Sequence, residues 1–152
     1  MLKIGDKAPD FTAMTSTGEE ISLSALKGKK YVLYFYPKDN TPGCTAEACS
    51  IRDNYNVFLN QGIPVFGVSG GSVQSHERFR EKYNLPFPLL MDEKFELAKK
   101  YNAWGRGNRV KRITYLINEE GKIEEIFGLP DHEKVKPKEH AQQIINFWEL
   151  EA

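Results

Sequence analysis

The sequence has little cysteine, no excess charge of either sign and no long apolar run, and each shortage excludes a class of protein. Only two cysteines occur in 152 residues, too few for a scaffold held together by disulfides. Lys plus Arg equals Asp plus Glu, at 21 each, which argues against nucleic acid or an anionic membrane as the main partner. No stretch of about 18 apolar residues exists, so no transmembrane helix is expected.

Export signals, linkers and repeats are also missing. The first ten residues lack the apolar centre of a signal peptide, so we expect a cytoplasmic protein. No repeat, linker or low-complexity stretch interrupts the chain, and its length suits one domain over residues 1–152. A domain of this size buries roughly two-thirds of its unfolded surface, enough to fold without a metal or disulfide.

The apolar pattern predicts an α/β fold, with a central mixed β-sheet flanked by helices and an N-terminal β-hairpin. Residues 11–14 and 20–23 flank the turn signal Ser16-Thr17-Gly18 and predict the hairpin. Continuous apolar runs at 31–36 and 64–69 predict buried central strands. Further strands are expected at 88–91, 113–117 and 123–127, and helices at 42–59, 74–83, 95–101 and 137–150.

Cys44 lies in the loop after the strand at 31–36, at the sheet edge where such folds bind ligands. Thr41 suits an N-cap and Pro42 the first helical position, which makes Cys44 the third helical residue. Unpaired backbone N–H groups and the helix dipole there favour the thiolate. The dipole alone is too weak for full ionisation, so we expect a nearby cation, best supplied by arginine. The alternative is an inert buried cysteine.

Cys49 lies five positions after Cys44 on the same expected helix. Helix geometry places the two Cα atoms roughly 8.6 Å apart. A disulfide requires Cα atoms within about 7 Å. An intact helix therefore forbids the bond, and the first turns must unwind if the pair closes during turnover. The alternative is that Cys49 is a small apolar residue at the edge of the core.

The segment from Tyr34 to Cys49, YFYPKDNTPGCTAEAC, resembles the active-site segment of the peroxiredoxins. Pro37, Thr41 and Cys44 match the family pattern P-x-x-x-T-x-x-C. The flanking T-P-G and C-T-x-E-x-C are similar to the bacterioferritin comigratory protein, or peroxiredoxin Q, subgroup. Supporting matches occur at residues 68–69, 75–76, 85–90 and 111–117, so the resemblance covers nearly the whole chain. It implies a thioredoxin-like fold.

The resemblance also implies a function, that of a thiol-dependent peroxidase without a cofactor. Hydrogen peroxide and organic hydroperoxides would be the substrates. Cys44 would become a sulfenic acid, and Cys49 would resolve it as an intramolecular disulfide. Thioredoxin or a similar dithiol protein would then restore both thiols. An internal resolving cysteine makes a monomer the default expectation.

Residues around Cys44 receive roles from the same resemblance. Thr41 would orient the peroxide, and Arg112 would supply the expected cation. Pro37 would shield the sulfenic acid, and Glu47 would orient Arg112. The expected catalytic set is Cys44, Cys49, Thr41, Arg112 and Glu47, and the expected substrate-binding set is Pro37, Thr41, Gly43, Cys44 and Arg112.

Each of these residues also has a plainer interpretation. Thr41 can be only an N-cap, Pro37 only a strand end, Glu47 only a first-turn acidic residue and Arg112 only a surface charge. Phe87 and Trp104 can line the substrate pocket or simply pack in the core. Among the histidines, His76 is interpreted as structural, and His132 and His140 show no pattern that predicts a role.

Three other functions are alternatives to peroxide reduction. Two cysteines with no histidine nearby cannot supply the four ligands of a zinc site, so no metal is expected. A dithiol oxidoreductase of thioredoxin-like fold would use C-x-x-C, which is missing. A non-enzymatic redox sensor that uses Cys44 as a switch stays open, because a sensor needs no repeated turnover.

Overall fold

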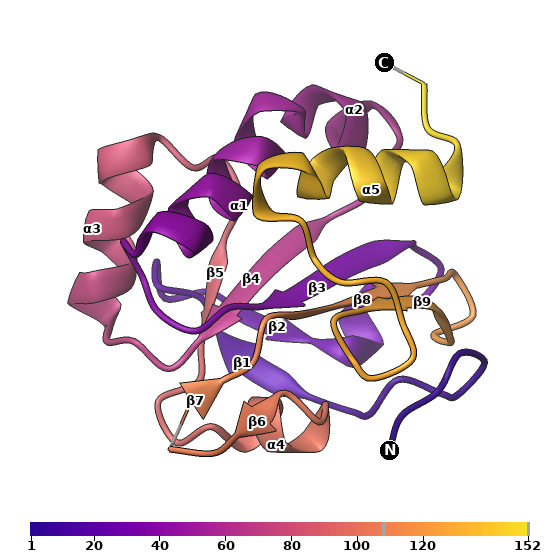
Figure 1. Cartoon of the computed structure of the whole chain (residues 1–152), viewed down its shortest axis with the longest axis horizontal. Helices are drawn as coiled ribbons and strands as arrows, with labels where there is room; N and C mark the ends of the chain where they lie inside the picture. The colour runs from indigo at the N-terminus through magenta and orange to yellow at the C-terminus, as the bar shows by residue number, and fades with distance from the viewer. Residues whose placement is uncertain (108, 152) are drawn as a thin grey trace.

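A mixed β-sheet forms the centre of the computed structural model, which describes residues 1–107 and 109–151 (Figure 1). Its strands are β3 (Tyr31–Phe35), β4 (Val65–Ser69), β5 (Leu89–Met91), β8 (Ile113–Ile117) and β9 (Ile123–Phe127). They lie in the order β5-β4-β3-β8-β9. The first three strands of that order are parallel, and β8 and β9 are antiparallel to their neighbours. The expected thioredoxin-like mixed sheet is confirmed.

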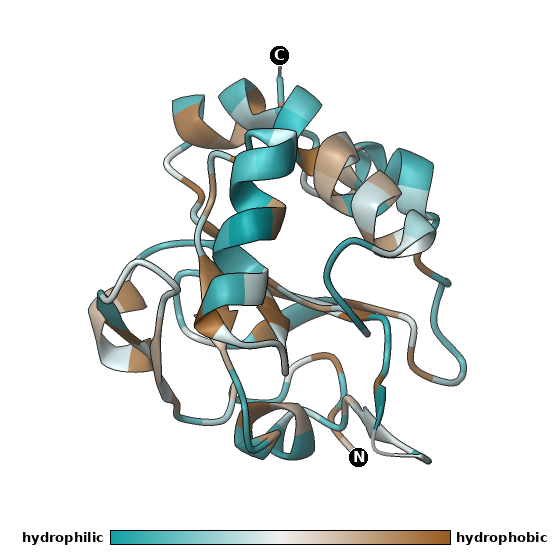
Figure 2. Cartoon of the chain, turned by 90° about the vertical axis from the view of Figure 1, so that its left-hand side faces the viewer, coloured by the Kyte–Doolittle hydropathy of each residue, from teal (hydrophilic) through white to brown (hydrophobic). Residues whose placement is uncertain are grey.

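Helices cover both faces of this sheet. One face packs against α1 (Pro42–Asp53), α2 (Tyr55–Asn60), α3 (Val73–Tyr83) and α5 (His140–Trp148). The other face packs against α4 (Glu96–Lys100), beside the N-terminal hairpin of β1 (Thr12–Met14) and β2 (Glu20–Ser22). In Figure 2 the foremost helix, α3, is hydrophilic towards the viewer, as expected of an outer layer.

The central strands are buried on both faces, which explains their continuous apolar sequence. In β3, Val32 and Tyr34 enter the core beneath α1, whereas Leu33 and Phe35 enter the core beneath α4. Every residue of β3 and β4 is buried. The predicted central strands are therefore confirmed, because a strand covered on both faces has no polar side to alternate with.

The helix expected at 42–59 is wrong as a single element. It ends at Asp53, and a separate helix, α2, begins at Tyr55. Asn54 separates the two helices, and its side-chain amide donates to the carbonyl of Ser50 at 2.9 Å. An asparagine that bonds locally to the backbone competes with helix continuation. Leu59, in α2, is exposed.

Two smaller differences concern the second half of the chain. The helix expected at 137–150 begins as a 3₁₀ turn, Pro137–Glu139, and is α-helical only from His140. The pairing of β6 (Trp104–Gly105) with β7 (Arg109–Val110) was not predicted. Two residues per strand are too few to show a period. Another 3₁₀ turn, Leu23–Leu26, follows β2.

Gly128 directly follows β9 and packs closely against the backbone of Arg112, the residue before β8. Its φ is +100°, a region that favours glycine. A Cβ at this position would overlap the carbonyl oxygen of Arg112. Gly121, in the turn between β8 and β9, also has a positive φ of +78°, but a Cβ there would meet nothing within 4 Å.

Gly128→Ala is expected to destabilise the protein more than Gly121→Ala. The Gly121 variant carries only the backbone cost, about 1 kcal/mol. The Gly128 variant adds a collision with backbone atoms, for a total loss of about 3 kcal/mol. Urea unfolding of the two variants checks this difference. Equal losses would show that the contact with the Arg112 carbonyl contributes nothing.

Candidate active site

Cys44 is the third residue of α1 and is buried, with 1% of its surface exposed. Thr41 precedes the helix in extended conformation, as an N-cap does. Thr41 is the N-cap residue, as predicted, but its side chain makes no capping bond, because its hydroxyl donates to the Lys38 carbonyl at 2.8 Å. The Thr41 hydroxyl therefore takes up none of the first-turn N–H groups around Cys44.

Arg112 brings a cation to this helix start. It precedes β8, whose Ile113 pairs with Phe35 at the end of β3. The loop that leads from β3 to α1, and so to Cys44, leaves the sheet at that same end. The guanidinium Nη2 of Arg112 donates to Cys44 Sγ at 3.5 Å. Sheet topology thus joins residues 68 positions apart in the sequence.

Gly43 makes room for this approach. A Cβ on Gly43 would lie 2.9 Å from Nη2 of Arg112, closer than real Cβ contacts allow. The atom it would meet is the end of a flexible side chain, so a larger residue would push the guanidinium away without disturbing the backbone. The glycine before the cysteine is thereby linked to the position of the arginine.

Glu47 lies one turn after Cys44 and is completely buried, so it is not a surface residue of the first turn. Its Oε1 accepts from Arg112 Nη1 at 2.8 Å. Its Oε2 has no hydrogen-bond partner among the described residues. Burial raises the pKa of Glu47 to about 7, against the opposing effect of Arg112.

His140 is a member of this cluster that the sequence did not reveal. It is the first residue of α5 and is fully buried. Its Nε2 lies 2.7 Å from Thr114 Oγ1 and 3.7 Å from Glu47 Oε2, and its Nδ1 lies 2.8 Å from Gln143 Oε1. Burial lowers its pKa to about 4. Only the fold brings these partners together, from β8, α1 and α5.

Cys49 lies in the middle of α1, half-buried, and both cysteines are free. The helix is unbroken between Cys44 and Cys49. The structure therefore holds the two sulfurs on one rigid element, in the geometry that forbids a disulfide.

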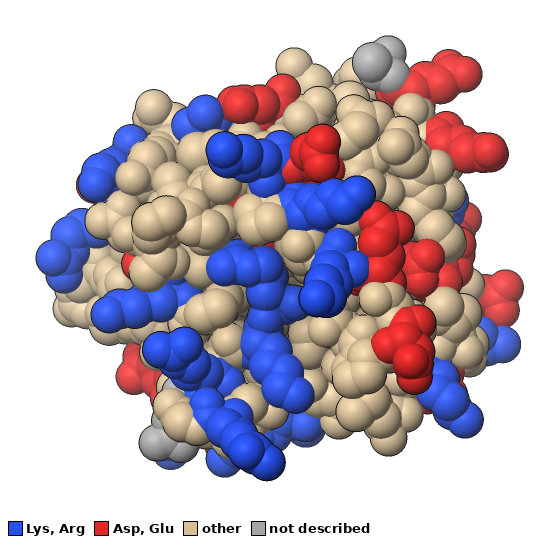
Figure 3. All heavy atoms as spheres, in the orientation of Figure 1, with Lys and Arg blue, Asp and Glu red and all other residues tan. Residues whose placement is uncertain are grey.

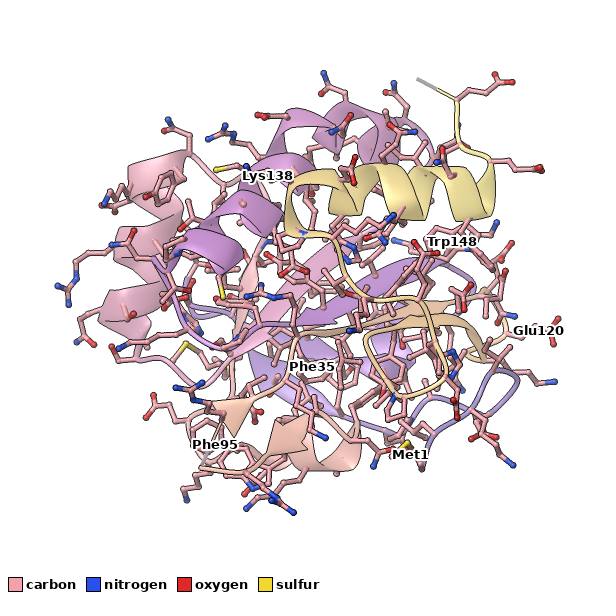
Figure 4. All side chains as sticks on the ribbon, in the orientation of Figure 1. Met1, Phe35, Phe95, Glu120, Lys138 and Trp148 are labelled. Atoms are coloured by element: carbon pink, nitrogen blue, oxygen red, sulfur yellow. The ribbon has the colours of Figure 1, made fainter. Side chains whose placement is uncertain are left out.

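Pro37 and Thr41 lie at the wall of a cavity of about 560 Å³ beside the start of α1. Phe95, labelled in Figure 4, contributes an apolar wall from the loop before α4. Phe87 and Trp104 are not in its wall. Phe87 is fully buried against Tyr34 and Tyr55, and Trp104 stacks on Phe95.

The loop between β3 and α1 is fixed to α3 by buried hydrogen bonds to Asp39. Asp39 accepts from His76 Nδ1 at 2.6 Å, from the Ser75 hydroxyl at 2.6 Å and from the Tyr36 hydroxyl at 2.6 Å. Burial alone would raise the pKa of Asp39, but the bond from His76 leads the effects that lower it below its usual value. His76 has a structural contact here, consistent with its interpretation from the sequence.

The chain has equal numbers of positive and negative residues, but their charges are unevenly distributed over the surface. Figure 3 shows Lys and Arg gathered on the face that carries α1 and β7 in Figure 1, so anions meet positive potential on that side.

Within the described part of the chain, no group of three or more His, Cys, Asp or Glu side chains is arranged to hold a metal. No helix in residues 1–107 and 109–151 has the length and hydropathy needed to cross a membrane.

Known proteins share both the sequence and this architecture. Residues 4–126 match the model of the AhpC/TSA family. Peroxiredoxin Bcp of Bacillus subtilis is 40% identical over 151 residues, which cover 95% of this chain and 93% of that protein.

Solved structures agree with the sequence match. A cysteine-to-serine mutant of Xylella fastidiosa PrxQ superposes with a TM-score of 0.88 at 30% identity, covering 98% of this chain and 96% of that one. The bacterioferritin comigratory protein of Xanthomonas campestris, studied for alkyl peroxide reduction, superposes with a TM-score of 0.83 at 29% identity, with the same coverage. The chain therefore belongs to the AhpC/TSA family and is a thiol-dependent peroxidase of the Bcp and peroxiredoxin Q group.

Proposed function

We propose that Cys44 is the thiolate that attacks the peroxide, with Arg112 as the cation that holds both thiolate and substrate. The observation that carries this proposal is the hydrogen bond of 3.5 Å from Arg112 Nη2 to Cys44 Sγ at the start of α1. The guanidinium cannot lose its charge near neutral pH, so it favours the thiolate throughout the cycle. The helix dipole acts in the same direction.

The first chemical step forms one bond and breaks one. The Cys44 thiolate attacks an oxygen of the hydroperoxide, so that an S–O bond forms as the O–O bond breaks. Cys44 becomes a sulfenic acid, and the departing alkoxide or hydroxide takes up a proton to give an alcohol or water. The Thr41 hydroxyl donates to Lys38, which leaves its oxygen free to accept the hydrogen of the incoming hydroperoxide.

Cys49 completes the cycle in our proposal. Its thiolate attacks the sulfenic sulfur of Cys44, an S–S bond forms and hydroxide leaves as water. Because α1 holds the sulfurs apart, its first turns must unwind for this step. The break at Asn54 keeps α1 short, so that unwinding need not disturb α2. Thioredoxin or a similar dithiol protein then reduces the disulfide by two exchange steps.

The surroundings of Thr41 suit substrates larger than hydrogen peroxide. The cavity beside it, which Cys44 and Arg112 do not line, has a volume of about 560 Å³, and Pro37 and Phe95 offer apolar surface there. We therefore include organic hydroperoxides among the substrates, with Pro37 limiting the access of water to the sulfenic acid. An internal resolving cysteine requires no second chain, so we propose a monomer that works in the cytoplasm.

Cys44→Ser is expected to abolish peroxide reduction, because serine has no comparable anion at neutral pH. Cys49→Ser is expected to retain one rapid oxidation of Cys44 and to lose turnover with thioredoxin. Stopped-flow oxidation and a thioredoxin-coupled assay separate the two results. Normal turnover in the Cys49 variant would remove Cys49 from the cycle, and normal turnover in the Cys44 variant would overturn the assignment.

Gly43→Ala is expected to slow the reaction with peroxide without destabilising the fold. The added methyl occupies the space of Arg112 Nη2, so the rate constant should fall at least about tenfold. Alanine favours a helix over glycine, so the free energy of unfolding should stay equal or rise by up to about 1 kcal/mol.

A double-mutant cycle with Arg112→Gln provides the control for this effect. If Gly43→Ala acts by displacing the guanidinium, it should add little to a variant that already lacks it. Independent, multiplicative losses in the double variant would show that Gly43 affects the rate by another route.

A further inference from the structure

Glu47 and His140 meet behind Arg112 in an arrangement that leaves one carboxyl oxygen without a donor. Both side chains are fully buried, and Glu47 Oε2 lies 3.7 Å from His140 Nε2. The other carboxyl oxygen is bound to Arg112. A charged carboxylate in this position would have half of its charge unsolvated, which is costly in a protein interior.

The hydrogen bonds of Gln143 establish which nitrogen of His140 carries its hydrogen. The backbone N–H of Lys136 donates to Gln143 Oε1 at 3.0 Å, so this oxygen is an acceptor. The Gln143 amide nitrogen in turn donates to Glu133 and to the Lys134 carbonyl. His140 Nδ1 lies 2.8 Å from the same Oε1 and must therefore donate to it.

This assignment determines what His140 presents to Glu47. In a neutral ring with hydrogen on Nδ1, Nε2 is an acceptor, and the Thr114 hydroxyl donates to it at 2.7 Å. The ring thus offers Glu47 Oε2 no hydrogen. Two acceptor atoms face each other in a fully buried site, and a proton on the carboxyl group removes the conflict.

We propose that Glu47 holds a proton on Oε2 opposite the neutral ring of His140, so that both are positioning residues that leave the charge of Arg112 to Cys44. This inference rests on the proposed role of Cys44 as the attacking thiolate. An ionised Glu47 would compete with the thiolate for the guanidinium, whereas a neutral Glu47 still orients it through Oε1.

The charged and titratable groups around the pair are consistent with this distribution of protons. Glu47 faces Arg112, which also reaches Cys44, and burial followed by the charge of Glu47 raises the pKa of Tyr34 in β3. Burial is the largest effect on the pKa of His140; Arg112 adds to the lowering, and Gln143 and Glu133 oppose it. Burial raises the pKa of Glu47 to about 7 and lowers that of His140 to about 4, so the pair holds one proton between these values.

The sign of the pH effect follows from these directions. The folded protein holds the Glu47 proton more tightly than an unfolded chain does, so this contribution to stability is present at low pH and is lost as pH rises through about 7. His140 acts oppositely, and its contribution is lost as pH falls through about 4. Between those limits the pair should not change charge.

The first test is spectroscopic and uses the reduced protein without peroxide. At a pH between these two limits, infrared spectroscopy should show a buried protonated carboxyl band that disappears in Glu47→Gln. Nitrogen NMR should show His140 as a neutral ring with hydrogen on Nδ1. Absence of the carboxyl band, or a charged His140, would overturn the proposal.

A second test compares two substitutions of His140 in a Cys49→Ser background, so that Cys44 is the only cysteine that titrates. Gln places a donor where Nε2 was, which favours an ionised Glu47, and the midpoint of the thiolate titration should rise by about one pH unit. Asn replaces only the Nδ1 donor, so the midpoint should stay near its original value. Equal shifts would indicate a merely structural role and contradict the proposal.

Both tests are independent of turnover. A protein that failed as a peroxidase would still give these spectra and titrations, and an active enzyme with an ionised Glu47 would reject this inference alone.

Discussion

The guanidinium of Arg112 connects the parts on which the site depends. One of its nitrogens reaches Cys44 and another reaches Glu47, so a single side chain spans the first turns of α1. The pairing of β8 with β3 brings it there, and Gly43 lets it approach. A shift of this side chain would change the surroundings of both the thiolate and the neighbouring carboxyl.

Helix α1 has to meet two opposing requirements in the proposed cycle. Folded, α1 places Cys44 at its positive end and buries the thiol beneath Arg112, which suits the attack on peroxide. Folded, it also keeps Cys49 out of reach. In the proposed cycle α1 therefore has to be stable enough to form the site and weak enough to open afterwards. A short helix with a buried, poorly solvated glutamate is suited to both.

The sequence predicts the elements whose patterns are local. Strands β3, β4, β8 and β9 follow from apolar runs, and the position of Cys44 in the first turn follows from Thr41 and Pro42. The break at Asn54 was missed because it depends on one side-chain bond to Ser50. Arg112 and Glu47 were identified by resemblance to a family, because no local pattern joins residues so far apart. His140 was missed because its partners converge only in the folded chain.

The most direct measurement is mass spectrometry of the reduced protein after one equivalent of hydrogen peroxide, with remaining thiols blocked. The account predicts loss of two hydrogens, mapped to a bond between Cys44 and Cys49, which requires α1 to unwind. A stable sulfenic acid on Cys44 with Cys49 still free would contradict internal resolution. No reaction at Cys44 would contradict the assignment of Cys44 as the residue that attacks the peroxide.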